Sequence, residues 1–164
     1  MQSRLLPATR GLADALAAKG REFDGITRSG RTQLQDAVPI RLGQEPRAYG
    51  AAVARRADWI ERSAEDLHEL NLGATAAGTG MNGHPACSAA VTLRLAELTG
   101  FLLRPAPSPV EATQSLAAFA QVSGALRSLA PELTRPPTIF GPLARGRLRA
   151  SWSSLSPPFS RARR

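Results

Sequence analysis

The sequence predicts an all-α fold that ends in an irregular C-terminal tail. Apolar residues recur at i+3, i+4 and i+7 spacing over several long stretches, which is the pattern of amphipathic helices. No stretch shows the period-two alternation of a half-buried strand. From residue 135 onward the helical spacing is lost and Pro, Ser and Arg predominate. We therefore expect residues 135–164 to be irregular.

Two amphipathic helices are predicted in the N-terminal half. The first covers residues 3–23, which are rich in Ala and Leu. The second covers residues 42–72, with Pro46 in its first turn, where a missing N–H costs little. At about 30 residues, this predicted helix exceeds the usual globular length and favours a helical bundle. Residues 26–40 between the helices contain the loop-forming residues Thr27, Ser29, Gly30, Thr32 and Pro39, and they are predicted to form a loop.

Two further helices are predicted in the C-terminal half. The Gly-rich residues 73–80 cannot continue a helix comfortably, so they end the second one. A third helix covers residues 86–99 and is followed by an extended linker that contains three prolines between 105 and 109. A fourth helix covers residues 110–134, and we expect Pro131 to kink or end it.

The net charge of +8 is concentrated in the predicted tail. Residues 1–134 contain 14 basic and 13 acidic residues, whereas residues 135–164 contain seven Arg and no acid. The tail lacks interleaved aromatic residues and any known nucleic-acid-binding motif. We therefore expect no nucleic-acid partner, although the isoelectric point near 11.4 would suggest one if the charge were evenly spread.

The cysteine content and the hydropathy favour the cytoplasm. Cys87 is the only cysteine, so an intramolecular disulfide is impossible and a reducing compartment is expected. No apolar run reaches the ~18 residues that suggest a membrane-spanning helix. The N-terminus also lacks the apolar core of a secretory signal. We expect no membrane partner.

A polar segment at residues 29–39 is the strongest candidate for chemistry. Its Thr hydroxyl, Gln amides and backbone N–H groups are suited to holding a carboxylate. Arg31 either adds a positive charge to such a site or forms a structural salt bridge. The composition alone favours a simpler interpretation, in which the segment is an ordinary polar loop between two helices.

The other candidate features are weaker. Residues 73–80 lack the Lys of a phosphate-binding P-loop and follow no predicted strand, so a tight turn is favoured. Glu65 and His68 are three residues apart and can meet, but a solvated charged face is the better interpretation, and we expect no metal site. His84 has no evident partner, and no His or acid is placed to activate Cys87.

Several long segments resemble, in order and in spacing, the signature regions of the aspartase/fumarase superfamily. They are GRTQLQDAVPIRLGQE (30–45), ELNLGATAAGTGMN (69–82), LAELTGF (95–101), PSPVEATQ (107–114) and SGALRSLA (123–130). The resemblance covers about residues 4–134. It implies that residues 1–134 are part of the long-helix central bundle of that fold.

Within the superfamily, three details resemble the aspartate ammonia-lyases more than the fumarate hydratases. They are Gln33 after residues 30–32, the sequence NLGAT at residues 71–75, and EAT at residues 111–113. This resemblance implies elimination of ammonia from L-aspartate to give fumarate, with no cofactor. It also implies that Thr32 and Gln33 contact a substrate carboxylate. A fragment of fumarate hydratase, acting on fumarate and L-malate, and a non-catalytic helical assembly subunit remain as alternatives.

The resemblance further implies that the intact enzyme contains parts outside this sequence. Family members are about three times as long, and their active sites form where three subunits of a homotetramer meet. Their N-terminal substrate loops and the loop with the catalytic Ser are not found in residues 1–164, so no catalytic residue is assigned here. We expect the chain alone to show no lyase activity.

The predicted tail departs from the family pattern at residue 135. Residues 137–141, PTIFG, can be encoded by codons that read Ala-Asn-Asp-Phe-Arg when shifted by one base. That string is the one with which family members continue their helix. We hypothesise that residues 135–164 are a frameshift product.

Overall fold

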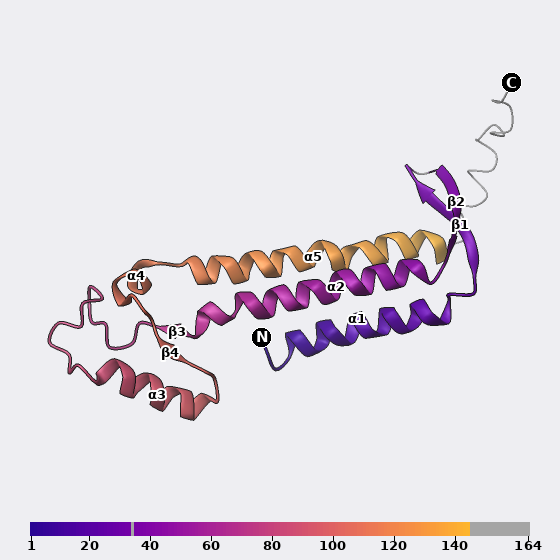
Figure 1. Cartoon of the computed structure of the whole chain (residues 1–164). Helices are drawn as coiled ribbons and strands as arrows, with labels where there is room; N and C mark the ends of the chain where they lie inside the picture. Colours follow the sequence, from indigo (N-terminus) through magenta and orange to yellow (C-terminus); the bar gives the residue numbers. More distant parts are fainter. Residues whose placement is uncertain (34, 145–164) are drawn as a thin grey trace, which may run out of the picture.

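Three long helices lie side by side and form the body of the molecule, with α2 between α1 and α5 (Figure 1). The structure is a computed structural model that describes residues 1–33 and 35–144. Its elements in chain order are α1 (Leu5–Glu22), β1 (Thr27–Thr32), β2 (Gln35–Arg41), α2 (Gln44–Ser63), the 3₁₀ helix η1 (Glu65–His68), β3 (Glu69–Leu70), α3 (Cys87–Thr99), β4 (Arg104–Pro105), α4 (Pro109–Gln114) and α5 (Ala117–Ala144). The prediction of a predominantly helical fold is confirmed.

The core lies along both sides of α2, because α1 covers one side and α5 covers the other. Val53, Ala57 and Ile60 of α2 are fully buried. They form one cluster with Leu6 and Ala13 of α1 and with Ala125 and Leu129 of α5. This burial supplies the main stabilisation of helices that expose their remaining faces.

The prediction of a loop at residues 26–40 is wrong, because this segment forms a β-hairpin. Strands β1 and β2 pair antiparallel from Thr27↔Arg41 to Thr32↔Gln35, with an irregularity between Ser29 and Arg31. Most residues of both strands are exposed, so neither face needs apolar side chains. The period-two signal of a half-buried strand is therefore missing although the strands are present.

The hairpin starts and ends where α1 and α2 come close together. Carbonyl oxygens of Phe23 and Ile26 accept hydrogen bonds from the N–H groups of Gly43 and Leu42 at 3.1 and 2.7 Å. A Cβ atom on Gly43 would lie 2.1 Å from the carbonyl oxygen of Gly20. Only glycine permits this approach, which closes the end of the α1–α2 pair next to the hairpin.

The second predicted helix is too long, because α2 ends at Ser63 and not at residue 72. The chain continues as the 3₁₀ helix η1 and the short strand β3, which pairs in parallel with β4. Leu67 and Leu70 are three residues apart and both half-buried, although Leu67 lies in η1 and Leu70 in the extended strand β3. Spacing alone could not distinguish this arrangement from a continuous helix.

The Gly-rich turn and the third helix are confirmed. Gly73, Gly78 and Gly80 all have positive φ, and a Cβ on Gly78 would lie 2.4 Å from the Cα of Val110 in α4. Helix α3 ends at Gly100, which has a φ of 72° in the left-handed region. The turn therefore depends on glycine both for its backbone angles and for its contact with α4.

The predicted fourth helix is interrupted near its start and does not end at Pro131. Helix α4 begins at Pro109, after the N-cap Ser108, and the chain breaks before α5 begins at Ala117. Helix α5 then continues through Pro131 to Ala144, so the helix extends ten residues into the segment predicted to be irregular. The rest of that segment, residues 145–164, lies outside the described residues.

Side chains on both sides of Pro131 hold α5 against α2. Leu129 is buried in the core before the proline. After it, Glu132 lies 4.0 Å from Arg56 of α2 and 3.0 Å from Arg135. The guanidinium of Arg135 lies 5.5 Å from the ring centre of Tyr49 in α2. These contacts offset the hydrogen bond that Pro131 cannot donate.

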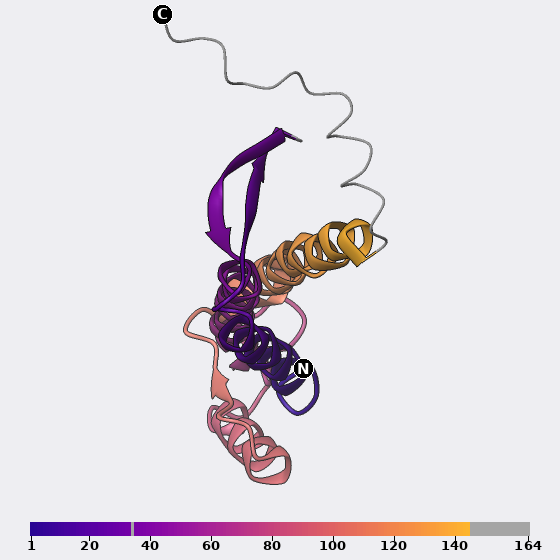
Figure 2. The same cartoon turned by 90° about the vertical axis from the view of Figure 1, so that its right-hand side faces the viewer.

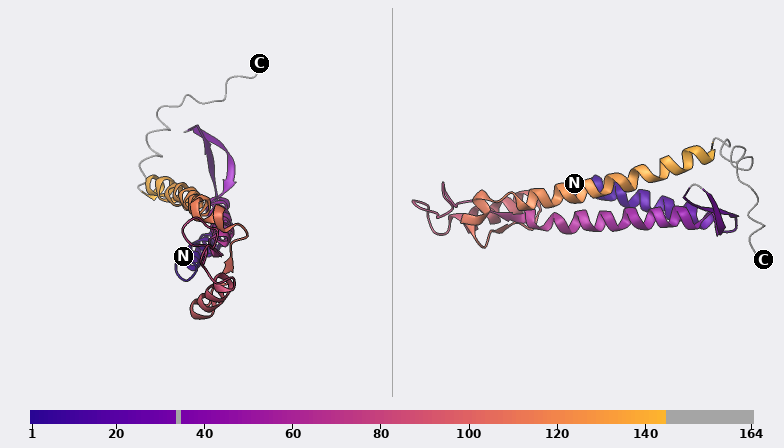
Figure 3. Two further views of the ribbon diagram at one scale, coloured as in Figure 1. Left: turned by 90° about the vertical axis from the view of Figure 1, so that its left-hand side faces the viewer. Right: turned by 90° about the horizontal axis from the view of Figure 1, so that it is seen from above.

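Smaller elements lie at the opposite end of the bundle from the hairpin (Figure 3). There the motif residues 69–82 and 107–114, far apart in sequence, come together. The Asn71 amide donates to the Thr113 hydroxyl at 3.3 Å, and Arg104 pairs with Glu69 at 3.0 Å beside the β3–β4 pairing. Among the described residues, no helix is both long and apolar enough to span a membrane.

Candidate functional site

The predicted substrate-binding residues Thr32 and Gln33 lie at the tip of the hairpin. Thr32 is the last residue of β1, and Gln33 has a φ of 51°, in the left-handed region, where the chain turns toward β2. Both residues are exposed. No hydrogen bond joins either side chain to another described residue, so the Thr hydroxyl and the Gln amide are available to a ligand.

The hairpin stands clear of the three helices, as Figure 2 shows. The helices therefore lie away from the tip. Arg31, the third polar residue proposed for this segment, donates from Nε to Asp36 on the opposite strand at 3.2 Å. Of the two roles considered for Arg31, the structure shows the salt bridge within the hairpin.

Ion pairs connect the base of the hairpin to the helices. Arg28 of β1 pairs with Glu45 in the first turn of α2. Asp24, just before β1, accepts hydrogen bonds from Arg41 at 2.9 Å and from Arg47 of α2. The sequence analysis did not identify these residues. The signal that could have found them is the presence of opposite charges on both sides of the segment 26–40.

Tyr49 lies one helical turn after Glu45 and is buried between the hairpin base and α5. Burial of the phenol raises the pKa of Tyr49, and the negative charge of Glu45 raises the same pKa further. Arg135 and Arg28 act in the opposite direction, because positive charges favour the phenolate and lower this pKa. The four residues therefore form one electrostatic group that joins β1, α2 and α5.

This arrangement predicts how the unfolding free energy depends on pH. The unfolded chain ionises its tyrosine near pH 10, whereas folded Tyr49 keeps its proton to higher pH. The free energy of unfolding should therefore fall as the pH rises above about 10, until the folded pKa is reached. Arg135→Met should raise the Tyr49 pKa and Glu45→Gln should lower it.

Phenolate absorbance measures this titration directly, because Tyr49 is the only tyrosine in the chain. Lys19→Met is a suitable control, since Lys19 pairs with Glu22 at an exposed position on α1. If the Tyr49 phenol titrates at the same pH in Arg135→Met as in the unchanged chain, the inference that Arg135 of α5 lowers the Tyr49 pKa is wrong.

The histidines and the cysteine considered in the sequence analysis all lie outside the hairpin. The ring of His68 stacks on Phe101 with centroids 6.1 Å apart, and His84 Nδ1 accepts a hydrogen bond from the Ala86 N–H at 3.2 Å. Cys87 is half-buried at the start of α3. Within residues 1–33 and 35–144, no group of three or more His, Cys, Asp or Glu side chains could hold a metal ion.

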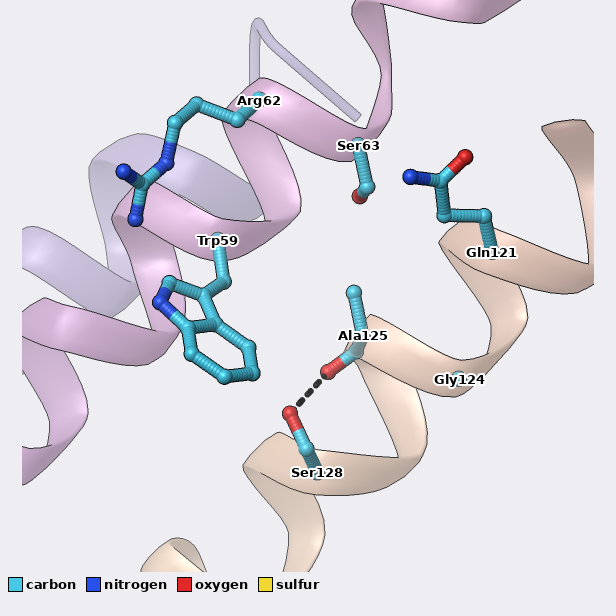
Figure 4. A pocket seen from close by; sticks show the side chains of 7 residues that line it. All are labelled: Trp59, Arg62, Ser63, Gln121, Gly124, Ala125 and Ser128. Carbon is cyan, nitrogen blue, oxygen red and sulfur yellow. Dashed lines mark hydrogen bonds between the residues drawn. The ribbon is translucent and has the colours of Figure 1, made fainter.

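A groove of about 540 Å³ lies between α2 and α5 (Figure 4). Trp59, Arg62 and Ser63 line one side of this groove, and Gln121 and Ser128 line the other. The Ser hydroxyls donate to backbone oxygens of their own helices, at 2.9 Å for Ser63 and 2.7 Å for Ser128. No His or acid lines the groove to activate them, so it offers no catalytic arrangement.

Comparison with known sequences identifies a family and individual relatives. The model of a family described as Lyase matches residues 1–136. The chain is 42% identical over 133 residues to an aspartate ammonia-lyase of Helicobacter pylori and 44% identical over 132 residues to those of Escherichia coli and Pseudomonas aeruginosa. These matches cover 80–81% of this chain but only 28% of each relative, so the chain spans about a quarter of their length.

Two solved structures illustrate the similarity in fold. A fumarate lyase:delta crystallin from Brucella melitensis, bound to cobalt, matches with a TM-score of 0.76 and 36% identity, over 82% of this chain and 31% of that one. A class II fumarase from Schistosoma mansoni matches with a TM-score of 0.78 and 29% identity, over the same fractions. About four fifths of this chain therefore shares its fold with parts of both proteins.

Proposed function

Because the chain belongs to this lyase family, we propose that it forms part of an aspartate ammonia-lyase, which eliminates ammonia from L-aspartate to give fumarate. The observation that carries the proposal is the identity of 42–44% to aspartate ammonia-lyases from three bacteria over four fifths of the chain. The fumarase has a lower identity of 29%, and it supports fumarate hydratase only as a member of the same superfamily.

The proposed role of this chain is to stabilise charge on the substrate. Removal of the Cβ proton of L-aspartate places negative charge on the β-carboxylate before ammonia leaves. Hydrogen-bond donors directed at that carboxylate lower the energy of this intermediate. We assign this role to the Thr32 hydroxyl and the Gln33 amide, which are exposed at the hairpin tip and unbonded to other described residues. The base that removes the proton comes from another part of the intact enzyme.

The proposed intact enzyme is a homotetramer, in which the exposed tip would meet residues of other subunits. Several large apolar side chains support this assembly because they are exposed along the helices. Trp59 of α2 is 53% exposed, Leu98 of α3 is 69% exposed and Phe119 of α5 is 65% exposed. Apolar surface of this kind is typical of subunit interfaces. We also propose a cytoplasmic location, on the basis of the single cysteine.

A chimeric enzyme tests the proposed function. Residues 1–134 replace the matching segment of the Escherichia coli aspartate ammonia-lyase, so that the rest of that enzyme surrounds them. We expect the purified chimera to form tetramers by light scattering and to produce fumarate and ammonia from L-aspartate. The unchanged E. coli enzyme and the isolated chain are the positive and negative controls.

Each alternative function has its own outcome in this experiment. Interconversion of fumarate and L-malate without ammonia release would favour the fumarate hydratase alternative. A correctly assembled tetramer without activity on either substrate would favour the non-catalytic assembly subunit. We retain the frameshift proposal for residues 135–164, which is supported by the end of the family match at residue 136. Resequencing the gene around codons 134–137 tests that proposal separately.

A further inference from the structure

The direction of the hairpin is determined by very few contacts. Its strands are mostly exposed, and the side chains of Thr32 and Gln33 at the tip make no hydrogen bond to the other described residues. The base of the hairpin touches α2 through the Arg28–Glu45 pair and through a hydrogen bond of 2.8 Å from the Arg41 N–H to the Gln44 side chain. Asp24, just before the hairpin, pairs with Arg41 and with Arg47 of α2. A two-stranded ribbon on its own is only marginally stable in water. Its orientation must therefore be set at the base.

The Arg28–Glu45 pair is the most buried ion pair of the hairpin. The two side chains are 20% and 21% exposed, whereas Asp36 near the tip and Arg41 near the base are 65% and 55% exposed. Arg28 Nε and Glu45 Oε2 are buried without a hydrogen-bond partner among the described residues. Burying two charges in this way costs desolvation energy, so the pair is a poor source of net stability. What it supplies is one defined geometry between β1 and α2.

The position of this pair connects it with the tip. Arg28 lies on β1 four residues before Thr32, a separation of about 13 Å along an extended strand. At that separation, a small rotation of the strand about its base displaces the tip by several times as much as it displaces Arg28. Glu45 lies in the first turn of α2, whose Val53 and Ile60 are fully buried, so this partner belongs to a rigid element.

We propose that Arg28 and Glu45 are positioning residues, whose half-buried ion pair sets the direction of the hairpin and thereby the location of Thr32 and Gln33. The importance of the tip rests on the proposed function, but the control of hairpin direction does not. Neither residue touches the substrate in this proposal.

Pulsed electron paramagnetic resonance of the full chain tests the proposal. Spin labels on Val38→Cys in β2 and Ala51→Cys in α2, both exposed positions, report the distance between hairpin and helix in a Cys87→Ser background. Glu45→Gln should shift and broaden the distance distribution, because it removes one charge while keeping the side-chain shape. Arg28→Lys retains the positive charge, so its distance distribution should stay nearly as narrow as that of the unchanged chain. A general loss of helix stability would not produce this difference between the two variants.

Two further variants keep the test conclusive. Lys19→Met removes an exposed ion pair of α1 and should leave the distribution unchanged. The charge exchange Arg28→Glu with Glu45→Arg should narrow the distribution again if Glu45→Gln broadens it by disrupting this pair. Far-ultraviolet circular dichroism verifies that the helices persist in each variant. A Glu45→Gln distribution as narrow as that of the unchanged chain, with the same mean, would overturn the proposal.

The chimeric enzyme distinguishes this proposal from the proposed function. In the chimera, Glu45→Gln should raise KM for L-aspartate and lower kcat. Arg28→Lys should change both constants less. If Thr32→Ala has no effect while Glu45→Gln still broadens the distance distribution, the role of the tip is wrong but the control of its direction stands. If Thr32→Ala abolishes activity and the distribution is unaffected by Glu45→Gln, the proposed function stands and the positioning role is wrong.

Discussion

Thr32→Ala should lower kcat/KM for L-aspartate in the chimeric enzyme by about 10²–10³-fold. The substitution removes one hydrogen-bond donor at the carboxylate where negative charge develops, and loss of one such donor has an effect of this size in other enzymes. The folded structure should change little, because Thr32 is exposed and ends a strand whose backbone pairing does not need the hydroxyl. Steady-state kinetics of fumarate formation, followed by ultraviolet absorbance, measure the loss.

Thr27→Ala is the matched control for this prediction. Thr27 is also exposed and begins the same strand, so the substitution removes the same atoms far from the tip. We expect kcat/KM of this control to stay within about twofold of the unchanged chimera, because Thr27 lies at the other end of β1 from the tip. Exposed substitutions of this kind also alter the free energy of unfolding by only ~0.5 kcal/mol, so the fold should be kept. Equal losses in the two variants would mean that the tip does not contact the substrate.

Ile60→Ala should destabilise the isolated chain by about 2–5 kcal/mol, the largest effect that we expect on stability. Ile60 is fully buried where α2 meets both neighbouring helices, so truncation leaves a cavity that the surrounding helices cannot fill without moving. Because natural domains are stable by only about 5–15 kcal/mol, this loss is a large part of the total. Urea unfolding followed by circular dichroism gives the free energy.

Leu98→Ala is the control for the core prediction. Leu98 is 69% exposed on α3, and its truncation should change the free energy of unfolding of the isolated chain by no more than ~0.5 kcal/mol. Comparable losses in the two variants would show that α2 is not the centre of the core. In the proposed tetramer, by contrast, Leu98 is a candidate for an interface and need not remain neutral.

The sequence predicts those elements whose side chains are buried on one side. Helices α1 and α2 place Leu6, Val53 and Ile60 in the core, and that burial requires the periodic apolar pattern by which the helices are found. The hairpin buries almost none of its side chains, so no pattern was required and none was present. The continuation of α5 past Pro131 is likewise not predicted from the sequence, because contacts with another helix support it. Glu132 lies near Arg56 of α2, and Arg135 lies over the ring of Tyr49.

The candidate site likewise contains residues that the sequence identifies and residues that only the structure reveals. Thr32 and Gln33 were identified through the resemblance of their segment to a known family, although the segment itself was predicted to be a loop. The Arg28–Glu45 pair and its connection with Tyr49 were not foreseen, because such partners become evident only once β1 is placed against α2. Pairing between separate elements leaves no periodic signal in a single sequence.

The central place of α2 has a consequence for the order in which the chain folds. Its partner α1 is joined to it by the short hairpin, whereas α5 is separated from it by residues 64–116. Closing the shorter loop costs less chain entropy, and both of its ends leave the ribosome first. The helical pair α1–α2 can therefore form during synthesis while the other side of α2 is still bare. Until α5 arrives, that side exposes apolar surface to which chaperones and unrelated nascent chains can bind.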